Sequence, residues 1–332
     1  MVCGLPLIKH AEQVCDTCVV TNQRRWLFPQ KAKYRAEDPL ELVHADLCGP
    51  VTPATPGGRR YFLLMVDDAS RFMWVALLPT KDAAADAVKL IKVEVEKESG
   101  HALKVLRTDN GGEFTVAEFA DYCAEEGVRR HFSAPHSPQQ NRVVERRNQT
   151  VVATARALLR QRRMPDKYWG EAVVTAVHLL NRSPTKSLLG KTPYEAWHGC
   201  APSVSHLKVF GCVTYVKDMG QLRKLDDRGK LGVFIGYAEG AKAYQILDPT
   251  MKRVMVSRDV VFDEGRGWDW STPGAGCSAA AGSEFTVELW TPGDQGGAPD
   301  ASSPASPAPR EFEEREAIPI GPSARTSSSS PT

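Results

Sequence analysis

The sequence has little that would suit a secreted or membrane-bound protein. Its eight cysteines are scattered apart from one C-x-x-C, formed by Cys15 and Cys18, so they do not indicate a disulfide framework. The first nine residues lack the apolar run of a signal peptide. The longest apolar helical stretch, residues 172–180, is too short to span a bilayer. We therefore expect a soluble intracellular protein with no membrane partner.

The net charge of the chain is also small, because the charges of two oppositely charged regions nearly cancel. The whole chain has a formal charge of +2, yet residues 263–332 hold eleven acidic side chains and only four Arg. This C-terminal part therefore carries −7, and the preceding 262 residues carry +9. A basic body with an acidic tail is compatible with a polyanionic partner.

Short apolar runs and helical periodicity alternate between residues 36 and 202. Apolar runs bounded by turn residues are typical of buried strands, and apolar spacings of three and four are typical of helices. The order of these signals predicts an α/β fold with a mixed sheet and flanking helices. Strands are expected at residues 42–47, 61–66, 73–78 and 104–108, and helices at residues 83–99, 118–126, 139–162 and 168–181.

The pattern changes after residue 203. Four strand signals follow at close spacing, at residues 209–216, 231–237, 244–247 and 254–262. They predict a small all-β barrel over residues 203–265. Residues 266–332 are rich in Gly, Pro, Ser and Ala and acidic overall. Because such a composition buries little apolar surface, we expect a disordered tail there.

Three acids lie where a metal-dependent reaction would need them. Asp46 lies within the first expected strand, Asp109 ends the strand that follows the first helix, and Glu145 lies in the long helix 35 residues further on. Carboxylate oxygens with open positions suit Mg²⁺, or Mn²⁺ in its place. Taken singly, each of the chain's 40 acids is more often a cap or a solvated group. The competing pair Asp67 and Asp68 reads as a turn between strands.

The sequence around these acids carries longer motifs, in order along the chain. They are HADLCGP (44–50), VDDASRF (66–72), RTDNGGEF (107–114), SAPHSPQQN (133–141), VVERRN (143–148), WGEAV (169–173), LNRSP (180–184), TPYE (192–195) and LKVFGC (207–212). Together they closely resemble the integrases of copia-type LTR retrotransposons, in register over about residues 5–265. Several long motifs with the 35-residue gap make this a specific signal.

The resemblance implies a function and a domain order. It implies a truncated zinc-binding segment over residues 1–35, an RNase H-like integrase catalytic core over 36–202 and an SH3-like barrel over 203–265. The residues that match Asp46, Asp109 and Glu145 bind the catalytic metals in that family. It further implies double-stranded DNA as partner, both element ends and target, self-association into a homo-oligomer, and a nuclear site of action after a cytoplasmic stage.

Two positions depart from the family's pattern. The family has Gly where this chain has Arg142, three residues before Glu145, and Gly permits a close backbone approach that Arg does not. The family's zinc segment also has two His upstream of the C-x-x-C, which this chain lacks. Zinc needs four ligands as a rule, so Cys15 and Cys18 are expected to be a relict half-site and Zn²⁺ is not expected as a cofactor.

The long helix is strongly basic. Between residues 142 and 163 the sequence has seven Arg against the single Glu145. Such charge beside a metal site fits contacts with DNA phosphates, although most charge runs are merely a solvated helix face. The expected DNA-binding residues are Gln139, Gln140, Arg142, Arg146, Arg147, Asn148, Arg156 and Arg160.

Two functional readings remain open at this point. The first is an integrase that binds retrotransposon DNA ends and transfers them into target DNA with Mg²⁺. The second is a truncated, catalytically silent relic that retains nucleic-acid binding, which Arg142 and the missing zinc histidines favour. A third reading, an RNase H of another kind, is disfavoured by the two helices after Glu145 and by the barrel.

Overall fold

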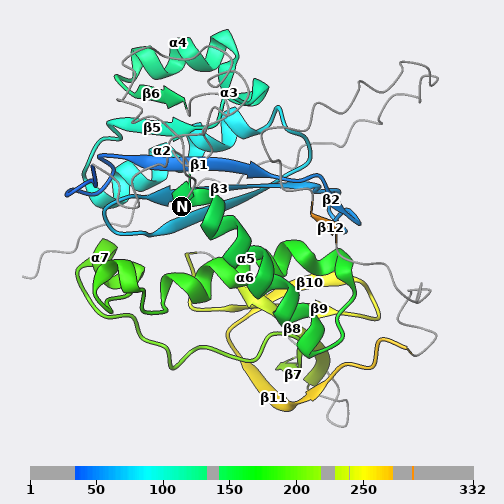
Figure 1. Cartoon of the computed structure of the whole chain (residues 1–332). Helices are drawn as coiled ribbons and strands as arrows, with labels where there is room; N and C mark the ends of the chain where they lie inside the picture. Colours follow the sequence, from blue (N-terminus) through cyan, green and yellow to red (C-terminus); the bar gives the residue numbers. More distant parts are fainter. Residues whose placement is uncertain (1–33, 133–141, 218–228, 239, 272–285, 288–332) are drawn as a thin grey trace, which may run out of the picture. The chain divides into compact units, whose positions relative to one another are not determined.

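The computed structural model describes residues 34–132, 142–217, 229–238, 240–271 and 286–287 (Figure 1). Its N-terminal part is built on a five-stranded sheet in the order β4-β3-β1-β5-β6. Strands β4, β3 and β1 pair antiparallel, whereas β5 and β6 run parallel to β1. The strands are β1 (Val43–Cys48), β3 (Tyr61–Asp67), β4 (Met73–Leu78), β5 (Val105–Thr108) and β6 (Arg129–Phe132).

Helices cover both faces of this sheet, because its strands are apolar on both sides. In β3, Phe62 and Leu64 belong to one hydrophobic cluster and Leu63 and Met65 to the other. Helices α2 and α4 pack on the second face and α5 and α6 on the first (Figure 1). The helices are α2 (Ala84–Ser99), α3 (Gly112–Thr115), α4 (Ala117–Glu125), α5 (Arg142–Gln161), α6 (Trp169–Asn181) and α7 (Pro193–His198), with 3₁₀ turns at Asp166–Tyr168 and Lys186–Leu188.

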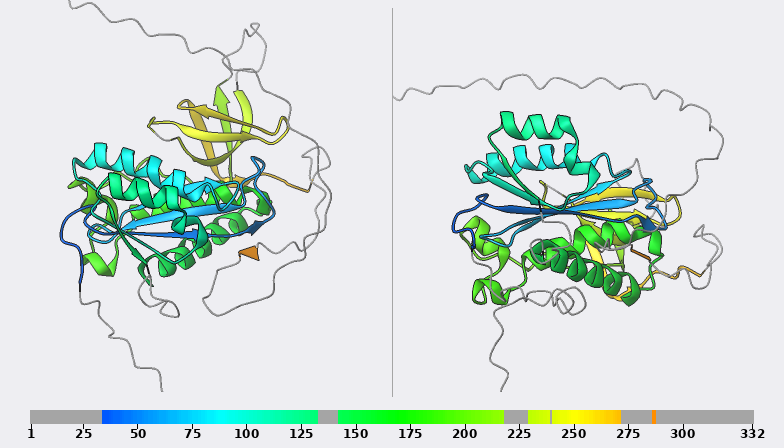
Figure 2. Two further views of the ribbon diagram at one scale, coloured as in Figure 1. Left: turned by 90° about the horizontal axis from the view of Figure 1, so that it is seen from above. Right: turned by 45° about the horizontal axis from the view of Figure 1, so that its top comes forward.

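A second, antiparallel sheet follows, in the order β10-β9-β8-β7-β11. Figure 2 shows its strands curving around one another as a small barrel. The α/β part and the all-β part thus confirm the expected fold class. The strands are β7 (Cys212–Lys217), β8 (Gly229–Tyr237), β9 (Tyr244–Asp248), β10 (Arg253–Ser257) and β11 (Val260–Gly267).

The barrel holds one strand more than the sequence predicted. The single strand expected at residues 254–262 is wrong, because β10 ends at Ser257 and β11 begins at Val260. Arg258 and Asp259 lie between them, and each strand then pairs with a different neighbour, β10 with β9 and β11 with β7. The polar residues Ser257, Arg258 and Asp259 interrupt the apolar run at this turn, which contains neither Gly nor Pro.

The predicted disordered tail is also wrong at its start. Strand β11 continues to Gly267, and Trp268 and Trp270 pack against the cluster that contains α5 and α6. Trp270 lies 5.7 Å from Tyr168 between ring centroids. A two-residue strand, β12 (Thr286–Val287), also pairs with β2 (Val51–Thr52). The apolar surface that these two Trp side chains bury stabilises an ordered conformation, although the segment that carries them is mostly polar.

The barrel and the α/β part share apolar surface. Val233 and Ile235 of β8 belong to the same hydrophobic cluster as Ala172 and Ala176 of α6. The guanidinium of Arg162, at the end of α5, donates hydrogen bonds to the backbone carbonyls of the residues at 264 and 265. The domain boundaries drawn from the sequence stay a prediction. None of the described helices combines the length and apolar character needed to cross a membrane.

Candidate active site

Asp46 lies near the carboxyl end of the central strand β1. Residues alternate between the two faces of a strand, so Val43 and Ala45 enter the cluster under α2 while Cys48 enters the cluster under α5. Asp46 shares the face of Cys48 and is therefore turned toward α5. Its side chain is partly buried.

Asp109 follows the neighbouring parallel strand. Strand β5 pairs with β1 in parallel, with His44 opposite Arg107, so the carboxyl ends of both strands meet at one edge of the sheet. The backbone amide of Gly111 donates to Asp109 Oδ1 at 3.2 Å, which closes the loop after β5. Burial raises the pKa of Asp109, and the Gly111 hydrogen bond partly offsets that rise. This edge is where the sequence expected two carboxylates to converge.

The third and fourth side chains come from α5. Glu145 and Asn148 are three residues apart and so lie on the same side of the helix. The Asn148 amide donates from Nδ2 to Asp46 Oδ2 at 2.6 Å. Asn148, which was predicted to contact DNA, is only 1% exposed, and its amide is engaged with the carboxylate of Asp46. Its Oδ1 is buried without a hydrogen-bond partner among the described residues.

The electrostatics show how closely these groups converge. The pKa of Asp46 rises to about 8, first through burial and next through repulsion by Asp109. The Asn148 hydrogen bond lowers it, and the charges of Glu145 and Glu113 raise it further. The structure therefore brings Asp46, Asp109 and Glu145 into one electrostatic site.

Glu113 is the residue that the sequence reasoning missed. It lies in α3, is partly buried, and has its pKa raised by burial and by the charge of Asp109. The only sequence signal for it was its place in the DNGGEF motif, four residues after Asp109. Lys81 is the cation that acts on both Asp109 and Glu113, and it lowers their pKa values.

The oxygen atoms of these side chains can be compared with the ligands that a divalent cation prefers. The converging groups offer carboxylate oxygens, which Mg²⁺ and Mn²⁺ prefer. Burial raises the pKa of Asp46 most, and the neighbouring charge of Asp109 raises it further. Among the described residues, no three His, Cys, Asp or Glu side chains surround one point closely enough to hold an ion. The chemistry of the donors therefore fits a divalent cation, while their present spacing does not enclose one.

The Asp67–Asp68 pair has a structural role, as expected for a turn. Asp67 accepts from the Ser70 hydroxyl at 2.6 Å, the Ser70 amide at 2.7 Å and the Leu40 amide at 2.9 Å. Asp68 accepts from Arg71 Nη1 at 2.6 Å and from the backbone amide at position 36 at 2.9 Å. All carboxylate oxygens of this pair therefore have partners.

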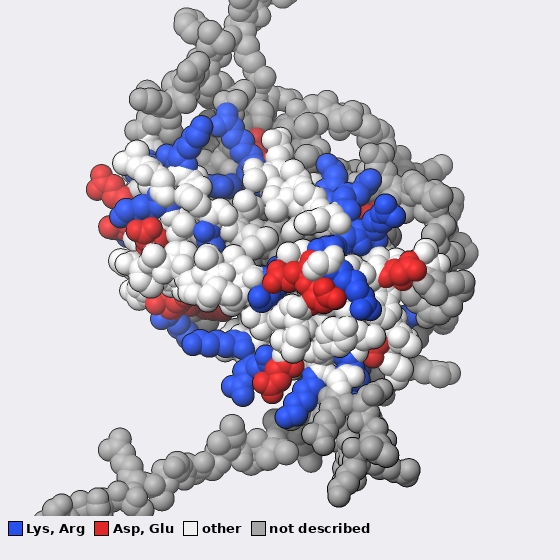
Figure 3. Space-filling model, turned by 90° about the horizontal axis from the view of Figure 1, so that it is seen from below, with Lys and Arg blue, Asp and Glu red and all other residues white. Residues whose placement is uncertain are grey.

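The exposed face of α5 carries several of the predicted DNA-binding residues. Arg146, Arg156 and Arg160 are exposed, and Arg147 is partly buried with its Nη2 3.4 Å from Thr185 Oγ1. Figure 3 shows Lys and Arg side chains in several separate groups on the face it displays, with acidic side chains among them. The side chains of Gln139, Gln140 and Arg142, and the cysteines Cys15 and Cys18, lie outside the described residues.

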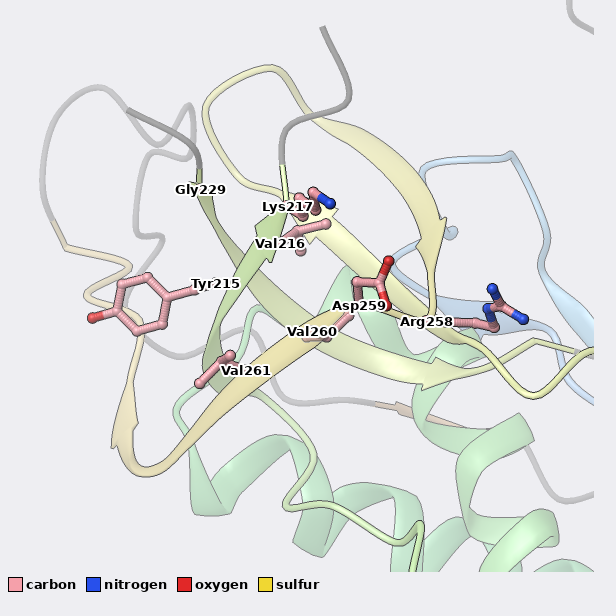
Figure 4. A pocket seen from close by; sticks show the side chains of 8 residues that line it. All are labelled: Tyr215, Val216, Lys217, Gly229, Arg258, Asp259, Val260 and Val261. Carbon is pink, nitrogen blue, oxygen red and sulfur yellow. The ribbon is translucent and has the colours of Figure 1, made fainter. Parts of the chain in front are cut away.

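A pocket of about 530 Å³ lies on the barrel and not at the carboxylates. Figure 4 shows Lys217, Arg258 and Asp259 at this pocket together with exposed apolar side chains. Tyr215 is 40% exposed and Val261 is 68% exposed, and the two are cross-strand neighbours in β7 and β11. None of the predicted catalytic residues lines the pocket, so it is a separate feature of the barrel.

Comparison with known proteins identifies two domains. Residues 36–138 match the integrase core domain, and residues 212–276 match the retroviral polymerase SH3-like domain. The chain is 43% identical over 251 residues to "Retrovirus-related Pol polyprotein from transposon TNT 1-94" of Nicotiana tabacum, an alignment that covers 75% of this chain and 19% of the relative. It is 31% identical over 281 residues to "Retrovirus-related Pol polyprotein from transposon RE2" of Arabidopsis thaliana, over 83% of this chain and 19% of the relative.

The chain thus spans about a fifth of the length of the curated relatives that it matches. Among solved structures, it is similar to a chain of a simian T-cell lymphotropic virus intasome in complex with the PP2A regulatory subunit B56 gamma. The TM-score is 0.45 at 17% identity, and the match covers 73% of this chain and 84% of that chain.

Proposed function

This chain belongs to the copia-type Pol polyprotein integrases, with an integrase core domain followed by a retroviral polymerase SH3-like domain, and we propose that it joins retrotransposon DNA ends to target DNA. DNA integration in the broad sense follows from the integrase core. The finer assignment, strand transfer that depends on Mg²⁺, is the proposal. The observation that carries it is the meeting of Asp46 and Asp109 at one sheet edge, beneath the helix that carries Glu145.

The reaction is a phosphodiester exchange. The oxygen of a 3′-hydroxyl on the element end attacks a phosphorus of the target strand, and a new P–O bond forms. The bond from that phosphorus to the target's own 3′ oxygen breaks, and the released oxygen takes a proton. The number of phosphodiester bonds is unchanged, so the exchange needs no external energy source. Trimming of the ends uses water in place of the 3′-hydroxyl.

The chain's carboxylates would hold the metal ions that this exchange needs. Divalent ions supply charge stabilisation at the attacking and leaving oxygens. Asp46, Asp109 and Glu145 would bind them, and Asn148 fixes the position of Asp46 through its hydrogen bond. A bound cation would favour the charged form of Asp46, whose pKa burial and Asp109 raise in its absence.

The DNA itself would lie along the basic helix. Arg146, Arg156 and Arg160 are exposed on α5, the helix that carries Glu145, and each can contact a phosphate. Gln139, Gln140 and Arg142 remain proposed contacts next to the start of α5. Self-association and a nuclear site of action are also proposals, which rest on membership of the family.

The decisive test is joining of a labelled element-end duplex to target DNA by the purified chain, with Mg²⁺ and with Mn²⁺. Glu145→Gln and Arg142→Gly are assayed beside the natural chain. Joined product that disappears in Glu145→Gln supports the integrase. Product only in Arg142→Gly means that the site is competent and that one side chain silences it. Absence of product from every protein, with DNA binding intact, overturns the proposal.

That last outcome would favour the second candidate, a silent relic that binds nucleic acid. The observation in its favour is Arg142, which stands where the family has Gly at the entry to the catalytic helix. A relic would bind duplex DNA with an affinity that falls steeply with salt. It would leave all phosphodiester bonds intact. The joining assay therefore separates the two candidates directly.

A further inference from the structure

The edge of the core sheet that β5 and β6 form carries several basic side chains. Arg107 of β5 pairs with His44 of β1 on one side and with His131 of β6 on the other. One pair earlier, Arg129 of β6 lies opposite Val105 of β5. Cross-strand neighbours, and residues two apart in one strand, share a face of the sheet. Arg107, Arg129 and His131 therefore lie on one face and form a basic row.

The basic row shares the face of the sheet on which Asp46 lies. Leu106 belongs to the cluster under α2 and α4, so Arg107, the next residue, is turned to the opposite face. His44, the neighbour of Arg107 in β1, precedes Asp46 by two residues and so has the same orientation as Asp46. Asp109 likewise follows Arg107 by two residues, and two residues of a strand span about 7 Å. The basic row therefore begins next to the carboxyl edge of the sheet.

The apolar cluster under α5 does not extend to this part of the sheet. From the core sheet it contains side chains of β1, β3 and β4, but no described residue of β5 or β6. Arg129 and His131 are exposed, and Arg107 is partly buried. On the face that carries the acids, the sheet is therefore polar and accessible to a ligand where β5 and β6 lie.

The positive charges of the basic row are not neutralised within the described part of the chain. No described side chain forms a salt bridge or a hydrogen bond with the side chain of Arg107, Arg129 or His131. The charge of Asp68 acts on Arg107, but the carboxylate of Asp68 already binds two other basic side chains. Burial lowers the pKa of Arg107, and burial followed by the charges of Arg107 and Arg129 lowers the pKa of His131. Basic groups that gather without a counter-ion attract an anion.

An extended polyanion fits this row better than a single small anion. Its members lie in two strands about 4.8 Å apart and at two positions about 7 Å apart along β6. Each strand of duplex DNA has one phosphate per about 3.4 Å of the helix axis, so the row can meet more than one phosphate of a strand. The planar guanidinium of Arg suits phosphate oxygens particularly well, because it donates two parallel hydrogen bonds.

We propose that Arg107, Arg129 and His131 form a second phosphate-binding surface for DNA, separate from the exposed arginines of α5, along which one DNA strand approaches the acidic edge of the sheet. This inference rests on the proposed function, because the ligand is the DNA that an integrase would join. The contacts predicted from the sequence lie on α5 or next to its start, whereas this surface belongs to β5 and β6. Contacts on both the helix and the sheet would hold the strand at two places.

The test is binding of a fluorescently labelled DNA duplex to the full chain, measured by anisotropy over a range of salt concentrations. Each phosphate contact contributes about one to the slope of log affinity against log salt concentration. We expect Arg107→Gln and Arg129→Gln each to lower this slope by about one and to weaken binding by about fivefold to tenfold. Arg107→Lys should keep most of the slope, because it keeps the charge.

Lys97→Gln is the matched control. Lys97 is exposed in the last turn of α2, and α2 packs on the opposite face of the sheet. The variant removes one positive charge, as Arg107→Gln does, and should leave the slope unchanged. A loss in Lys97→Gln as large as that in Arg107→Gln and Arg129→Gln would show that only the net charge matters, and it would overturn the proposed surface.

Arg146→Gln distinguishes failure of this inference from failure of the proposed function, because Arg146 is exposed on α5. If Arg146→Gln weakens binding while Arg107→Gln and Arg129→Gln behave like Lys97→Gln, DNA binding by α5 stands and the surface on the sheet is overturned. If the natural chain does not bind the duplex, both proposals fail. Thermal unfolding shows whether each variant is folded. Should Arg107→Gln unfold, Arg129→Gln carries the test, because Arg129 is exposed.

Discussion

Two acidic pairs in the same sheet have opposite environments. Asp67 and Asp68, after β3, are 0% and 4% exposed and receive hydrogen bonds from backbone amides, Ser70 and Arg71. Among the described residues, Asp46 of β1 accepts a hydrogen bond from the Asn148 amide, and Asp109, after β5, accepts one from the Gly111 amide. Every carboxylate oxygen of the first pair accepts a hydrogen bond, although burial still raises the pKa of Asp67, whereas fewer hydrogen bonds reach the second pair.

The difference appears directly in their protonation. Burial alone would raise the pKa of Asp68, but the His44 hydrogen bond, the Arg71 charge and a backbone amide together lower it to about 2. Asp46 has no such set of partners, and its pKa rises to about 8. An acid that folding has already satisfied serves structure. Burial and the charge of Asp109 instead favour the neutral form of Asp46.

Neutralising one acid of the unsatisfied pair should have the largest effect on activity and little on stability. We expect Asp46→Asn to reduce strand transfer by more than about a thousandfold, equal to about 4 kcal/mol of barrier. Its melting temperature without divalent ions should stay level, because a carboxyl with a pKa raised to about 8 is already mostly neutral at pH 7 and an Asn side chain can still accept from Asn148. Joining assays and thermal unfolding check this, with the exposed Asp121→Asn as control. Joining by Asp46→Asn above a tenth of the natural rate would contradict it.

The satisfied pair should respond in the opposite way. Asp68→Asn leaves the Arg71 guanidinium and His44 without their charged partner, and it should lower the free energy of unfolding by about 3 kcal/mol. Urea unfolding at pH 7 measures the loss. The matched control is Asp86→Asn, whose pair with Lys89 is screened by water and should contribute far less to stability. Equal losses in the two variants would show that the Asp68 network has no structural value.

Binding of a divalent ion should stabilise the variant of one pair and not that of the other, and this difference in stability should be smaller than the effects above. Mn²⁺ at ten times its dissociation constant should stabilise the natural chain by about 1.4 kcal/mol. Asp68→Asn should keep this increment, since its change lies outside the proposed metal site. Asp46→Asn should lose it, because it removes a proposed ligand. Thermal unfolding with and without the ion gives the comparison, and an equal increment in Asp46→Asn would rule out a role for that carboxylate.

The partly buried His178 is a basic group whose environment favours its neutral form, so it can be compared with the acidic pairs. His178 of α6 stacks on Tyr237 at 4.2 Å between centroids, and its Nε2 lies 3.3 Å from Nε2 of His206. Burial, followed by the charge of Arg182 and by His206, lowers the pKa of His178 to about 3. Its folded-state pKa is thus below the unfolded value of about 6.5. Stability is therefore complete above pH 6.5 and is lost as the pH falls from there toward 3.

Allowing for the partial exposure of the ring, we expect a loss on the order of 1 kcal/mol between pH 7 and pH 5. Urea unfolding at the two pH values measures it. His178→Phe should remove most of the difference, because the ring keeps its stacking on Tyr237 but no longer titrates. His101→Gln, at an exposed position, should keep the difference. An unchanged difference in His178→Phe would assign the pH dependence to other groups.

Local patterns predicted the elements of the fold well. The alternation in β3 and the periodicity of α2 are properties of neighbouring residues, and the observed bounds agree with the expected ones within a residue or two. The errors arose where a distant contact decided the outcome. Trp268 and Trp270 are ordered by a cluster that belongs to α5 and α6, and their own surroundings in the chain are polar.

The candidate site was also predictable only in part, because some of its features are local in the sequence and others depend on distant contacts. Its acids could be recognised in motifs, and the parallel pairing of β1 with β5 was implied by the order of the elements. Asn148 was predicted to contact DNA because it lies on a basic helix, and its hydrogen bond to Asp46 could not be predicted from the helix alone. Its partner Asp46 lies 102 residues away in the sequence. Glu113 was missed because nothing local shows that its carboxylate folds back over Gly111.

The sequence by itself determined which residue types are available at the sheet edge and in what order the strands and helices form. Those features depend on spacing along the chain, which is written in the sequence. Only the tertiary structure decided which acids are satisfied. Asp67 and Asp46 are the same residue type in neighbouring strands, and hydrogen bonds from Leu40, Ser70 and Asn148 separate their roles. Those bonds exist only once the chain has folded, because they act across distances of a few ångströms.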